Sequence, residues 1–412
     1  MPLVQCVIGC LYPRLESICL TKIGLENRSR HLRLTCSAAC ARTRSGADAQ
    51  ARLNAKVLKM RWTAIGSDLF CPVAVCQRPG EIALFARGAS GELFRKEWQD
   101  DGWGEVQSLG APVARLKGSA GTVPAAWELA ACSGDPKSIH LFARSPDGHL
   151  LQMVGSRGEW AAFECLGAPA KVSGGIAIPL GLDGALAACS TGSNRVDVFA
   201  VSLAGELLHT SWNGKDWSGF ESLGTSVMQQ GGSRQSVPLL GSLAACRCGA
   251  QGIGIFVRGN LGDLMMKWWN GKDWSEFASL GWPHVPDETY PAVTVAAPLT
   301  GPPAACSWGS ERIDVFARGS IGEVLHKWWD GKAWSDFESL GMPVTADARL
   351  EPLPSTGAIA ACSWGVGRLD VFTRAVGGNL YHAWWDGSWN HDSEPERPHS
   401  SPVEKDARQP FG

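Results

Sequence analysis

The fold is decided by the stretch Arg312-Ile313-Asp314-Val315-Phe316-Ala317-Arg318-Gly319, which recurs with variations along most of the chain. Each copy has a phenylalanine at the matching position, which we use as its anchor. The six anchors are Phe85, Phe142, Phe199, Phe256, Phe316 and Phe372. Successive anchors are 57, 57, 57, 60 and 56 residues apart. A period of this kind is typical of repeat architectures, in which one unit cannot bury its apolar face alone. The sequence therefore predicts six copies of one supersecondary unit.

Each copy of the repeat is built from strand and turn signals. The quoted stretch alternates apolar and other side chains with a period of two, which predicts a strand. A short strand of small residues is expected ahead of it at 304–308, and two more strands are expected at 323–329 and 334–340. Between the last two, Asp330-Gly331 is a strong hairpin signal, typical of a turn whose two residues both have positive φ. The same signal stands in three other copies, at Asn213-Gly214, Asn270-Gly271 and Asp386-Gly387.

The order of these strands indicates the fold class. Four antiparallel strands that run from small side chains to large ones are typical of a propeller blade, whose inner strand is crowded and whose outer sector is wide. The last copy lacks its fourth strand, but Lys59–Gly66 resembles a shortened version of it. We therefore predict an all-β propeller over residues 57–390, with six four-stranded blades, in which this N-terminal strand closes the last blade. Seven blades are the alternative.

The two flanks do not carry the repeat. Residues 1–56 hold five cysteines and a scatter of arginines, and they lack a convincing signal peptide. A targeting segment, a disordered arm and a start codon placed too early all remain open for this stretch, which we assign as a non-repeat, disordered N-terminal segment. Residues 391–412 are rich in Pro, Ser, Glu and Arg, which predicts a disordered tail.

Composition narrows the classes of partner. Lys and Arg number 38 and Asp and Glu number 40, so no excess of positive charge indicates binding to nucleic acid. The chain has no run of 18 apolar residues, so we expect no membrane span. Oligomer formation is left open.

Six cysteines stand in register, nine or ten residues before the anchor phenylalanines, at Cys76, Cys132, Cys189, Cys246, Cys306 and Cys362. Metal ligands or disulfides are one interpretation of this series. Because the chain has no CxxC pair and each copy has one such cysteine, we instead expect reduced thiols that pack as small buried side chains. The compartment cannot otherwise be read from the sequence, and unpaired cysteines slightly favour the cytoplasm.

Two copies combine a tryptophan with an arginine near the end of the first strand, namely Trp308 with Arg312 and Trp364 with Arg368. An aromatic ring can lie against the C–H face of a sugar while a charged side chain makes paired hydrogen bonds to its hydroxyls. We therefore take these four as candidate ligand-binding residues, with packing at the blade interface as the alternative.

Paired tryptophans follow on the third strand of several copies. Neighbours on a strand point to opposite faces, so one member of each pair is expected in the core. Trp328 and Trp384 complete the set of candidate ligand-binding residues, with a structural role as the favoured alternative.

Buried charges are expected on the strand of the anchor phenylalanine. In three copies an aspartate lies two residues before the anchor phenylalanine, on the same face of the strand. These are Asp197, Asp314 and Asp370. Each needs a partner, which we expect to be the arginine two residues earlier or one four residues later, such as Arg318 or Arg374. Three histidines, His209, His326 and His382, occupy equivalent positions in separate copies, too far apart in a ring to share a metal ion. We predict no metal site.

Three motifs of the fifth copy resemble the blade motif of Photorhabdus-type fucose-binding lectins. They are Arg-x-Asp-Val-Phe-x-Arg-Gly, His-x-Trp-Trp-Asp-Gly and Trp-Ser-x-Phe-Glu-Ser-Leu-Gly, within residues 312–341. The resemblance covers about residues 60–390, and it implies a β-propeller that holds sugars between neighbouring blades. It also implies fucose-like or O-methylated sugars as ligands and glycans or glycoconjugates as partners. The best-known members of this family have seven blades, whereas this chain shows six. The copies keep the residues of this motif to different degrees, so we expect the sites mainly around the last three blades.

Nothing in the repeat marks one residue for catalysis. Glycosidases need a pair of carboxylates at a defined separation, and no Asp, Glu, Tyr or His stands out against the repeat. We therefore predict no enzyme activity, no catalytic residue and no cofactor. The predicted function is that of a carbohydrate-binding lectin with multiple weak sites between blades. The alternative is a non-catalytic propeller scaffold for protein–protein interaction.

Overall fold

The computed structural model describes residues 62–390, with gaps at 68, 79–80, 100–101, 112, 116–121, 125–128, 136, 157–158, 174–175, 193, 231–232, 240–242, 250, 287–292 and 346–348. The predicted disordered segments 1–56 and 391–412 lie outside these residues. Every regular element within them is a strand, so no helix in the described ranges is available to cross a membrane.

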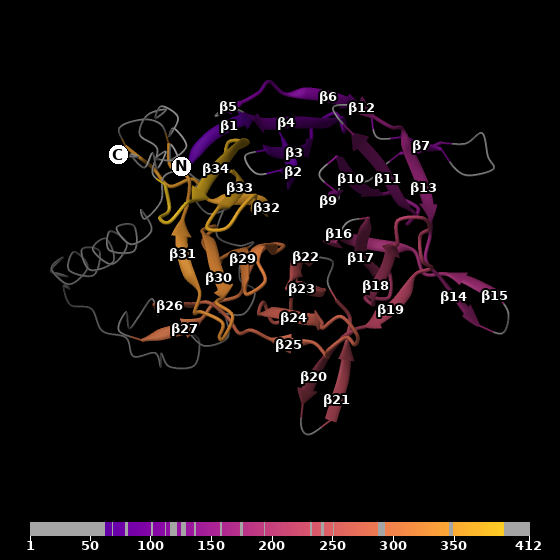
Figure 1. Cartoon of the computed structure of the whole chain (residues 1–412). Coiled ribbons are helices and arrows are strands. Elements are labelled where there is room, and N and C mark those ends of the chain that lie inside the picture. The colour runs from indigo at the N-terminus through magenta and orange to yellow at the C-terminus, as the bar shows by residue number, and fades with distance from the viewer. Residues whose placement is uncertain are drawn as a thin grey trace, which may run out of the picture. The chain divides into compact units, whose positions relative to one another are not determined.

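Six antiparallel sheets form a ring of blades (Figure 1). Blade 1 consists of β2 (Phe70–Arg78), β3 (Glu81–Arg87), β4 (Leu93–Gln99), β5 (Gly102–Trp103) and β6 (Gln107–Gly110). Blade 2 consists of β9 (Leu129–Asp135), β10 (Ser138–Arg144), β11 (Leu150–Ser156), β12 (Glu159–Trp160) and β13 (Phe163–Gly167). Blade 3 consists of β16 (Leu182–Gly192), β17 (Arg195–Ser202), β18 (Leu207–Trp212) and β19 (Glu221–Gly224).

The remaining three blades follow the same order from the axis outward. Blade 4 consists of β22 (Leu243–Cys248), β23 (Gly252–Arg258), β24 (Leu264–Trp269) and β25 (Ala278–Ser279). Blade 5 consists of β28 (Ala304–Gly309), β29 (Arg312–Arg318), β30 (Val324–Trp329) and β31 (Glu338–Gly341). Blade 6 consists of β32 (Ser355–Cys362), β33 (Leu369–Ala375), β34 (Asn379–Trp385) and β1 (Thr63–Ser67).

The ring closes after six blades. The first strand of each blade contacts the first strands of the two neighbouring blades, and the series returns from β32 to β2. The closing strand β1 pairs antiparallel with β34, with Thr63 opposite His382. This confirms the predicted six-bladed, all-β propeller and the role of the N-terminal strand, and the seven-bladed alternative is wrong. Residues 59–61 of the predicted closing segment lie outside the described residues.

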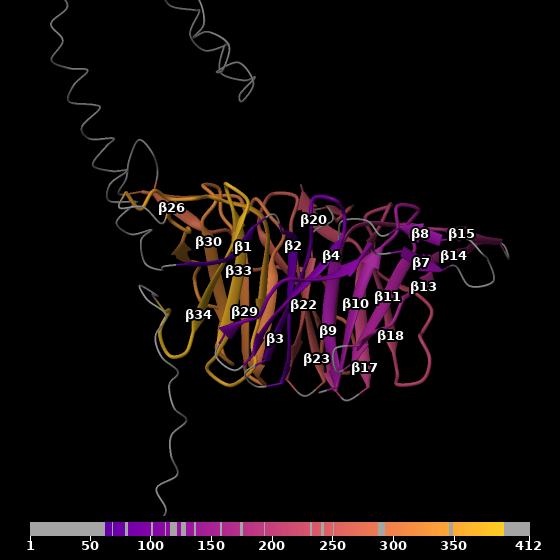
Figure 2. The ribbon, with the colours of Figure 1, turned by 90° about the horizontal axis from the view of Figure 1, so that it is seen from above.

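Four hairpins lie in the connections between one blade and the next. They are β7–β8 (Val113–Arg115 and Thr122–Pro124), β14–β15 (Ala170–Ser173 and Ile176–Pro179), β20–β21 (Ser226–Gln230 and Ser233–Val237) and β26–β27 (His284–Pro286 and Thr294–Ala296). All four lie toward the same edge of the ring, the upper one in Figure 2. The second strand of each blade begins at the opposite edge, because the strands alternate in direction.

The core lies between neighbouring blades. Each anchor phenylalanine is fully buried and packs edge-to-face against an outer tryptophan of the following blade. The six pairs are Phe85–Trp160, Phe142–Trp217, Phe199–Trp274, Phe256–Trp334, Phe316–Trp389 and Phe372–Trp103, with ring centres 5.2–6.2 Å apart. The same contact, repeated around the ring, explains why the anchor is the most constant residue of the repeat.

The predicted hairpin geometry is wrong in one respect. Gly331 has a φ of 92°, but Asp330 is not among the described residues with positive φ. The aspartate instead uses its side chain, since Asp330 Oδ1 accepts the backbone N–H groups of Lys332 and Ala333 at 2.9 and 2.8 Å. A bridge between Trp329 and Trp334 then closes a four-residue loop. The fourth strand of this blade is also shorter than predicted, because it spans only Glu338–Gly341.

The in-register cysteines occupy the inner strands as expected. Cys132, Cys189 and Cys246 are buried free thiols, and Cys306 and Cys362 hold the same buried position. Burial raises the pKa of the Cys132 and Cys189 thiols, because a thiolate would lose its hydration there. The side chain of the sixth cysteine, in blade 1, lies outside the described set.

Candidate functional site

Blade 5 brings three of the predicted site residues together. Arg312, the first residue of β29, has its guanidinium carbon 4.7 Å from the ring centre of Trp308 and 5.2 Å from that of Trp328. The edge of the same guanidinium donates to Asp314, with Nη2 2.7 Å from Oδ1 and Nε 3.0 Å from both oxygens. The arginine is thus held by two aromatic rings and a carboxylate.

Blade 6 repeats this arrangement with the other three predicted residues. The guanidinium carbon of Arg368 lies 5.2 Å from the ring centre of Trp364 and 5.4 Å from that of Trp384. Its Nη2 and Nε donate to the two oxygens of Asp370 at 2.7 and 2.9 Å. The six predicted residues therefore form two equivalent Trp–Arg–Trp clusters, one in each blade.

The aspartates of these clusters are fully buried, as is Asp197 in blade 3. In all three, the expected arginine two residues earlier is a partner. The partner expected four residues later is wrong, because Arg318 donates to Thr300 instead. The second partner is a histidine of the next strand, which the sequence analysis did not pair with the aspartate. His209, His326 and His382 place Nε2 within 3.0, 2.9 and 2.9 Å of the carboxylates.

These partners decide the charge state of the carboxylates. Burial pushes the pKa of Asp197 and Asp370 upward, but hydrogen bonds from histidine and arginine outweigh burial and hold both pKa values below the usual range of a carboxyl. Asp197 and Asp370 are therefore anions at neutral pH, and each fixes the orientation of one arginine and one histidine.

Blade 3 keeps the arginine but lacks both tryptophans around it. Two residues after the inner cysteine, blade 3 has Thr191 and blade 5 has Trp308. On the third strand, Ser211 lies opposite the buried aspartate in blade 3, whereas Trp328 lies opposite it in blade 5. As a result, the side chain of Arg195 is 47% exposed, whereas those of Arg312 and Arg368 are 22% and 15% exposed. The guanidinium of blade 3 is open to a ligand.

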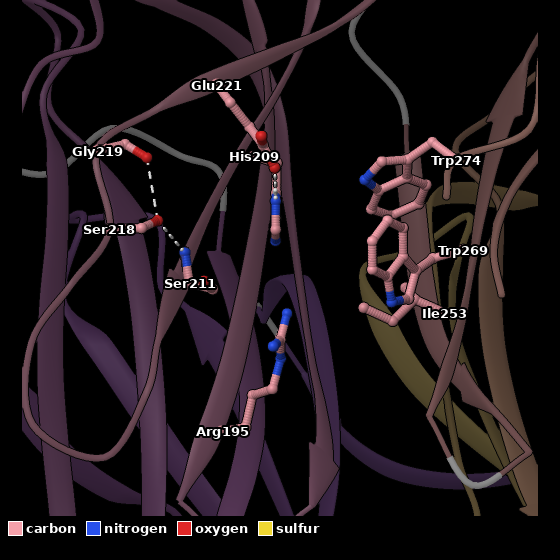
Figure 3. A pocket seen from close by; sticks show the side chains of 9 residues that line it. All are labelled: Arg195, His209, Ser211, Ser218, Gly219, Glu221, Ile253, Trp269 and Trp274. Carbon is pink, nitrogen blue, oxygen red and sulfur yellow. Dashed lines mark hydrogen bonds and ion pairs between the residues drawn. The ribbon is translucent and has the colours of Figure 1, made fainter. Parts of the chain in front are cut away.

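A pocket of about 200 Å³ lies at this point, between blades 3 and 4. Figure 3 shows Arg195, His209 and Glu221 on one side and the rings of Trp269 and Trp274 on the other. The lining is completed by Ser211, Ser218, Gly219 and Ile253. Pockets for drug-sized ligands span roughly 300–1,000 Å³, so this volume suits a single small ring.

The two walls of the pocket differ in chemistry. Blade 3 supplies a cation, a carboxylate that is 60% exposed at Glu221, and serine hydroxyls. Blade 4 supplies aromatic surface from Trp269 and Trp274, whose ring centres lie 5.3 Å apart. One wall can make charged hydrogen bonds to hydroxyl groups while the other covers an apolar face. The arrangement is suited to holding a sugar ring.

Sequence reasoning missed Glu221, Trp269 and Trp274 as members of one site. Glutamate and the paired tryptophans recur in several copies, so neither stands out within its own copy. The signal that could have found them is the pairing across strands, because Glu221 lies opposite His209 as Glu338 lies opposite His326. The opposing tryptophans come from the following copy, which only the ring brings near.

The junctions between other blades keep the arginine, histidine, glutamate and tryptophan residues of this pocket to different degrees. At the junction of blades 5 and 6, Glu338 bonds His326 as Glu221 bonds His209, and the ring centre of Trp389 lies 5.7 Å from that of His326. At the junction of blades 6 and 1, His382 lies 5.5 Å from Trp103, but Thr63 stands where the other two blades have glutamate.

Blade 4 has lost the whole polar set. Its register places four other residues at the positions of arginine, aspartate, histidine and glutamate, namely Gly252, Gly254, Met266 and Ala278. The four polar residues disappear together, as expected of groups that hold one another in place. Blade 4 therefore contributes only its aromatic wall, to the pocket of blade 3. Within the described residues, no group of three His, Cys, Asp or Glu side chains is arranged to hold a metal ion.

Comparison with known proteins gives matches among solved structures alone. No family model and no curated protein matches the chain. The Aleuria aurantia lectin, a fungal lectin with a six-bladed β-propeller fold and a novel fucose recognition mode, is 17% identical with a TM-score of 0.51, over 79% of this chain and 96% of that one. A variant of this lectin in complex with Fucα1-6GlcNAc is 16% identical with a TM-score of 0.52, over 79% and 96% of the two chains. A variant of AofleA from Arthrobotrys oligospora is 15% identical with a TM-score of 0.56, over 80% and 88%. At these identities the similarity shows the fold, and the chain is a six-bladed β-propeller, the fold described for the Aleuria aurantia lectin.

Proposed function

We propose that this protein is a carbohydrate-binding lectin with several weak sites between its blades. The observation that carries the proposal is the pocket at the junction of blades 3 and 4, where Arg195 and Glu221 face Trp269 and Trp274. The solved structures with the same fold include fucose-binding lectins, which supports a glycan as the partner. Fucose-like or O-methylated sugars are the proposed ligand class, from the resemblance to Photorhabdus-type lectins.

In the proposed complex, a sugar ring enters between the two walls. Its C–H face lies against the tryptophans of blade 4, and its hydroxyls receive hydrogen bonds from Arg195 and donate to Glu221. Hydrogen bonds to charged groups each contribute about 1.5–3 kcal/mol, but part of this is spent on immobilising the ligand. A small shallow site of this kind binds weakly, and a protein with several such sites gains strength from multivalency.

The Trp–Arg–Trp clusters of blades 5 and 6 are proposed as parts of two further sites. Trp308 and Trp328, with Trp364 and Trp384 in the next blade, cover the faces of the arginines. The edges of Arg312 and Arg368 that do not bond aspartate remain for a ligand. These sites differ from the pocket of blade 3 in having less exposed arginines.

The proposal is tested on a glycan array, followed by calorimetric titration with methyl α-L-fucoside. We expect binding that free monosaccharide competes and that Arg195→Ala or Glu221→Ala weakens about tenfold or more, by loss of one charged hydrogen bond. Trp308→Ala and Trp364→Ala test the clusters of blades 5 and 6, and Lys215→Ala, on an exposed loop, is the matched control. Retention of the fold in each variant is checked by circular dichroism.

One outcome would favour the alternative. A blank result across fucosylated and methylated glycans at high protein concentration would contradict the lectin proposal. It would leave a non-catalytic scaffold for protein partners as the better explanation, in line with the lost polar set of blade 4.

A further inference from the structure

Two histidines each lie between two carboxylates. His209 places Nε2 3.0 Å from Oδ1 of the buried Asp197 and Nδ1 2.7 Å from Oε1 of Glu221. In blade 5 the two distances from His326 are both 2.9 Å, to Asp314 and Glu338. The ring therefore connects a fully buried anion to the glutamate that faces the pocket.

A count of protons decides the state of these rings. A neutral imidazole has one N–H group, and an ionised carboxylate can only accept. Asp197 is ionised, because it receives two hydrogen bonds from Arg195. Glu221 is 60% exposed to solvent, and its Oε1 is the second acceptor at the ring. A neutral ring would leave one of the two short N···O contacts without a proton, whereas an imidazolium ring supplies a proton to both.

The surroundings of His209 are consistent with a cation. Strand β17 contributes Asp197 and Arg195, and β19 contributes Glu221, so that two cations and two anions balance. The ring of Phe199 stacks on it at 4.8 Å, and blade 4 adds only the neutral Trp274 at 5.9 Å. The remaining titratable groups near Asp197 are the Cys132 and Cys189 thiols, which burial keeps neutral by raising their pKa.

Blade 6 contains a natural control. His382 contacts Asp370 through Nε2 at 2.9 Å, but Thr63 lies opposite it where the other two blades have glutamate. One N–H group is enough for this single contact. His382 therefore has no structural need to be doubly protonated.

We infer that His209 and His326 are positioning residues that, as imidazolium ions, hold the ligand-facing glutamates Glu221 and Glu338 against the buried aspartates. Loss of the Nδ1 proton at higher pH then releases the glutamate, which weakens ligand binding in blades 3 and 5 and leaves blade 6 unchanged. The effect on ligands rests on the proposed function, whereas the protonation state does not.

The protonation state is measured by nitrogen NMR of the full chain labelled with ¹⁵N-histidine, with no ligand present. Single His→Gln variants assign the signals. At neutral pH, we expect both nitrogens of His209 and His326 to have the shifts of protonated imidazolium, and His382 to titrate at a lower pH than either. Neutral single-tautomer spectra for His209 and His326 would overturn the inference, whatever the protein binds.

Two exposed positions provide variants that should fold. Glu221→Gln replaces the second carboxylate by an amide, so His209 should no longer be held as an imidazolium ion. Thr63→Glu supplies the missing carboxylate in blade 6, so His382 should retain its second proton to a higher pH. Unchanged titration in both variants would contradict the inference.

Ligand binding separates this inference from the proposed function. Titration with methyl α-L-fucoside from about pH 6 to about pH 9 should show a several-fold loss of affinity, and Thr63→Glu should add the same pH dependence to the site of blade 6. Sugar binding that does not change over this range would overturn the positioning role while the lectin proposal stands. No sugar binding at any pH would contradict the lectin proposal, and the nitrogen spectra alone would then decide the protonation state.

Discussion

At the scale of single residues, the largest electrostatic cost lies at Asp197, Asp314 and Asp370, whose side chains are fully buried. A buried carboxylate is tolerated only when paired and hydrogen-bonded. Each of the three has a bidentate arginine and a histidine on the neighbouring strand. Since Arg195 and His209 also line the pocket of blade 3, the pairing that makes burial tolerable also orients the site.

The same pairing makes stability depend on pH on the acid side. The pKa values of Asp197 and Asp370 are lowered in the folded protein, so the unfolded state binds more protons in acid. This contribution is fully present above the unfolded carboxyl pKa of about 3.9 and is lost as pH falls through the lower folded values. We expect the melting temperature to fall steeply below about pH 4. Melting curves from pH 7 to pH 2 check this. Asp370→Asn should be less stable at neutral pH, and its melting temperature should fall less steeply as the pH is lowered. An equally steep loss in that variant would show that other groups control acid unfolding.

At the scale of elements, the short strand β1 closes the ring. It pairs with β34 and turns the open edge of blade 6 into an internal strand. Trp62, directly before it, is 7% exposed and packs in the cluster between blades 5 and 6 that contains Phe316 and Tyr381. The strand thus joins the two ends of the repeat by hydrogen bonds and by apolar burial.

Loss of the contacts made by Trp62 and β1 should destabilise the folded protein. Trp62→Ala is expected to destabilise the protein by about 3–5 kcal/mol, the usual range for truncating a large buried aromatic residue. Deletion of residues 57–68 should expose the edge of β34 and cause aggregation. Removal of residues 1–50, which lie outside the described residues, is the control and should leave the propeller folded. Denaturant unfolding and light scattering measure both effects. A deletion of 57–68 that stays monomeric and equally stable would show that β1 does not close the ring.

The elements also show which features were predictable from sequence. The six blades and the closing strand followed from periodicity, because every blade must bury the same face against its neighbour. The loop at Asp330 was predicted with the wrong geometry. We expected a positive φ at this residue, but its side chain accepts two backbone N–H groups of the turn and Asp330 is not among the described residues with positive φ. The pocket was not predicted because Glu221 and Trp274 belong to different copies. Arg312 and Arg368 were predicted with their tryptophans because those residues lie within one blade.

At the scale of the whole molecule, the ring repeats one scaffold but not one site. Among the described residues, the arginine–aspartate–histidine set occurs in blades 3, 5 and 6, and the glutamate joins it in blades 3 and 5. Blade 1 has Ala83 and blade 2 has His140 at the position of the buried aspartate. The number of sites in the proposed lectin therefore depends on which copies keep this set and not on the symmetry of the fold.

The loss of this set from the other copies predicts the valency of the proposed lectin. We expect at most three monosaccharides per chain, with the site of blade 6 the weakest because the uncharged Thr63 hydroxyl is a weaker hydrogen-bond acceptor than a carboxylate. Glu221→Ala should lower the measured number of sugar sites by one, and Thr63→Glu should strengthen the site of blade 6. Calorimetry with free sugar gives the number of sites. Binding to a dense glycan surface should be tighter than to free sugar by orders of magnitude, because several sites engage at once. A stoichiometry near six, or one unaffected by Glu221→Ala, would show that the arginine–glutamate set does not define the sites.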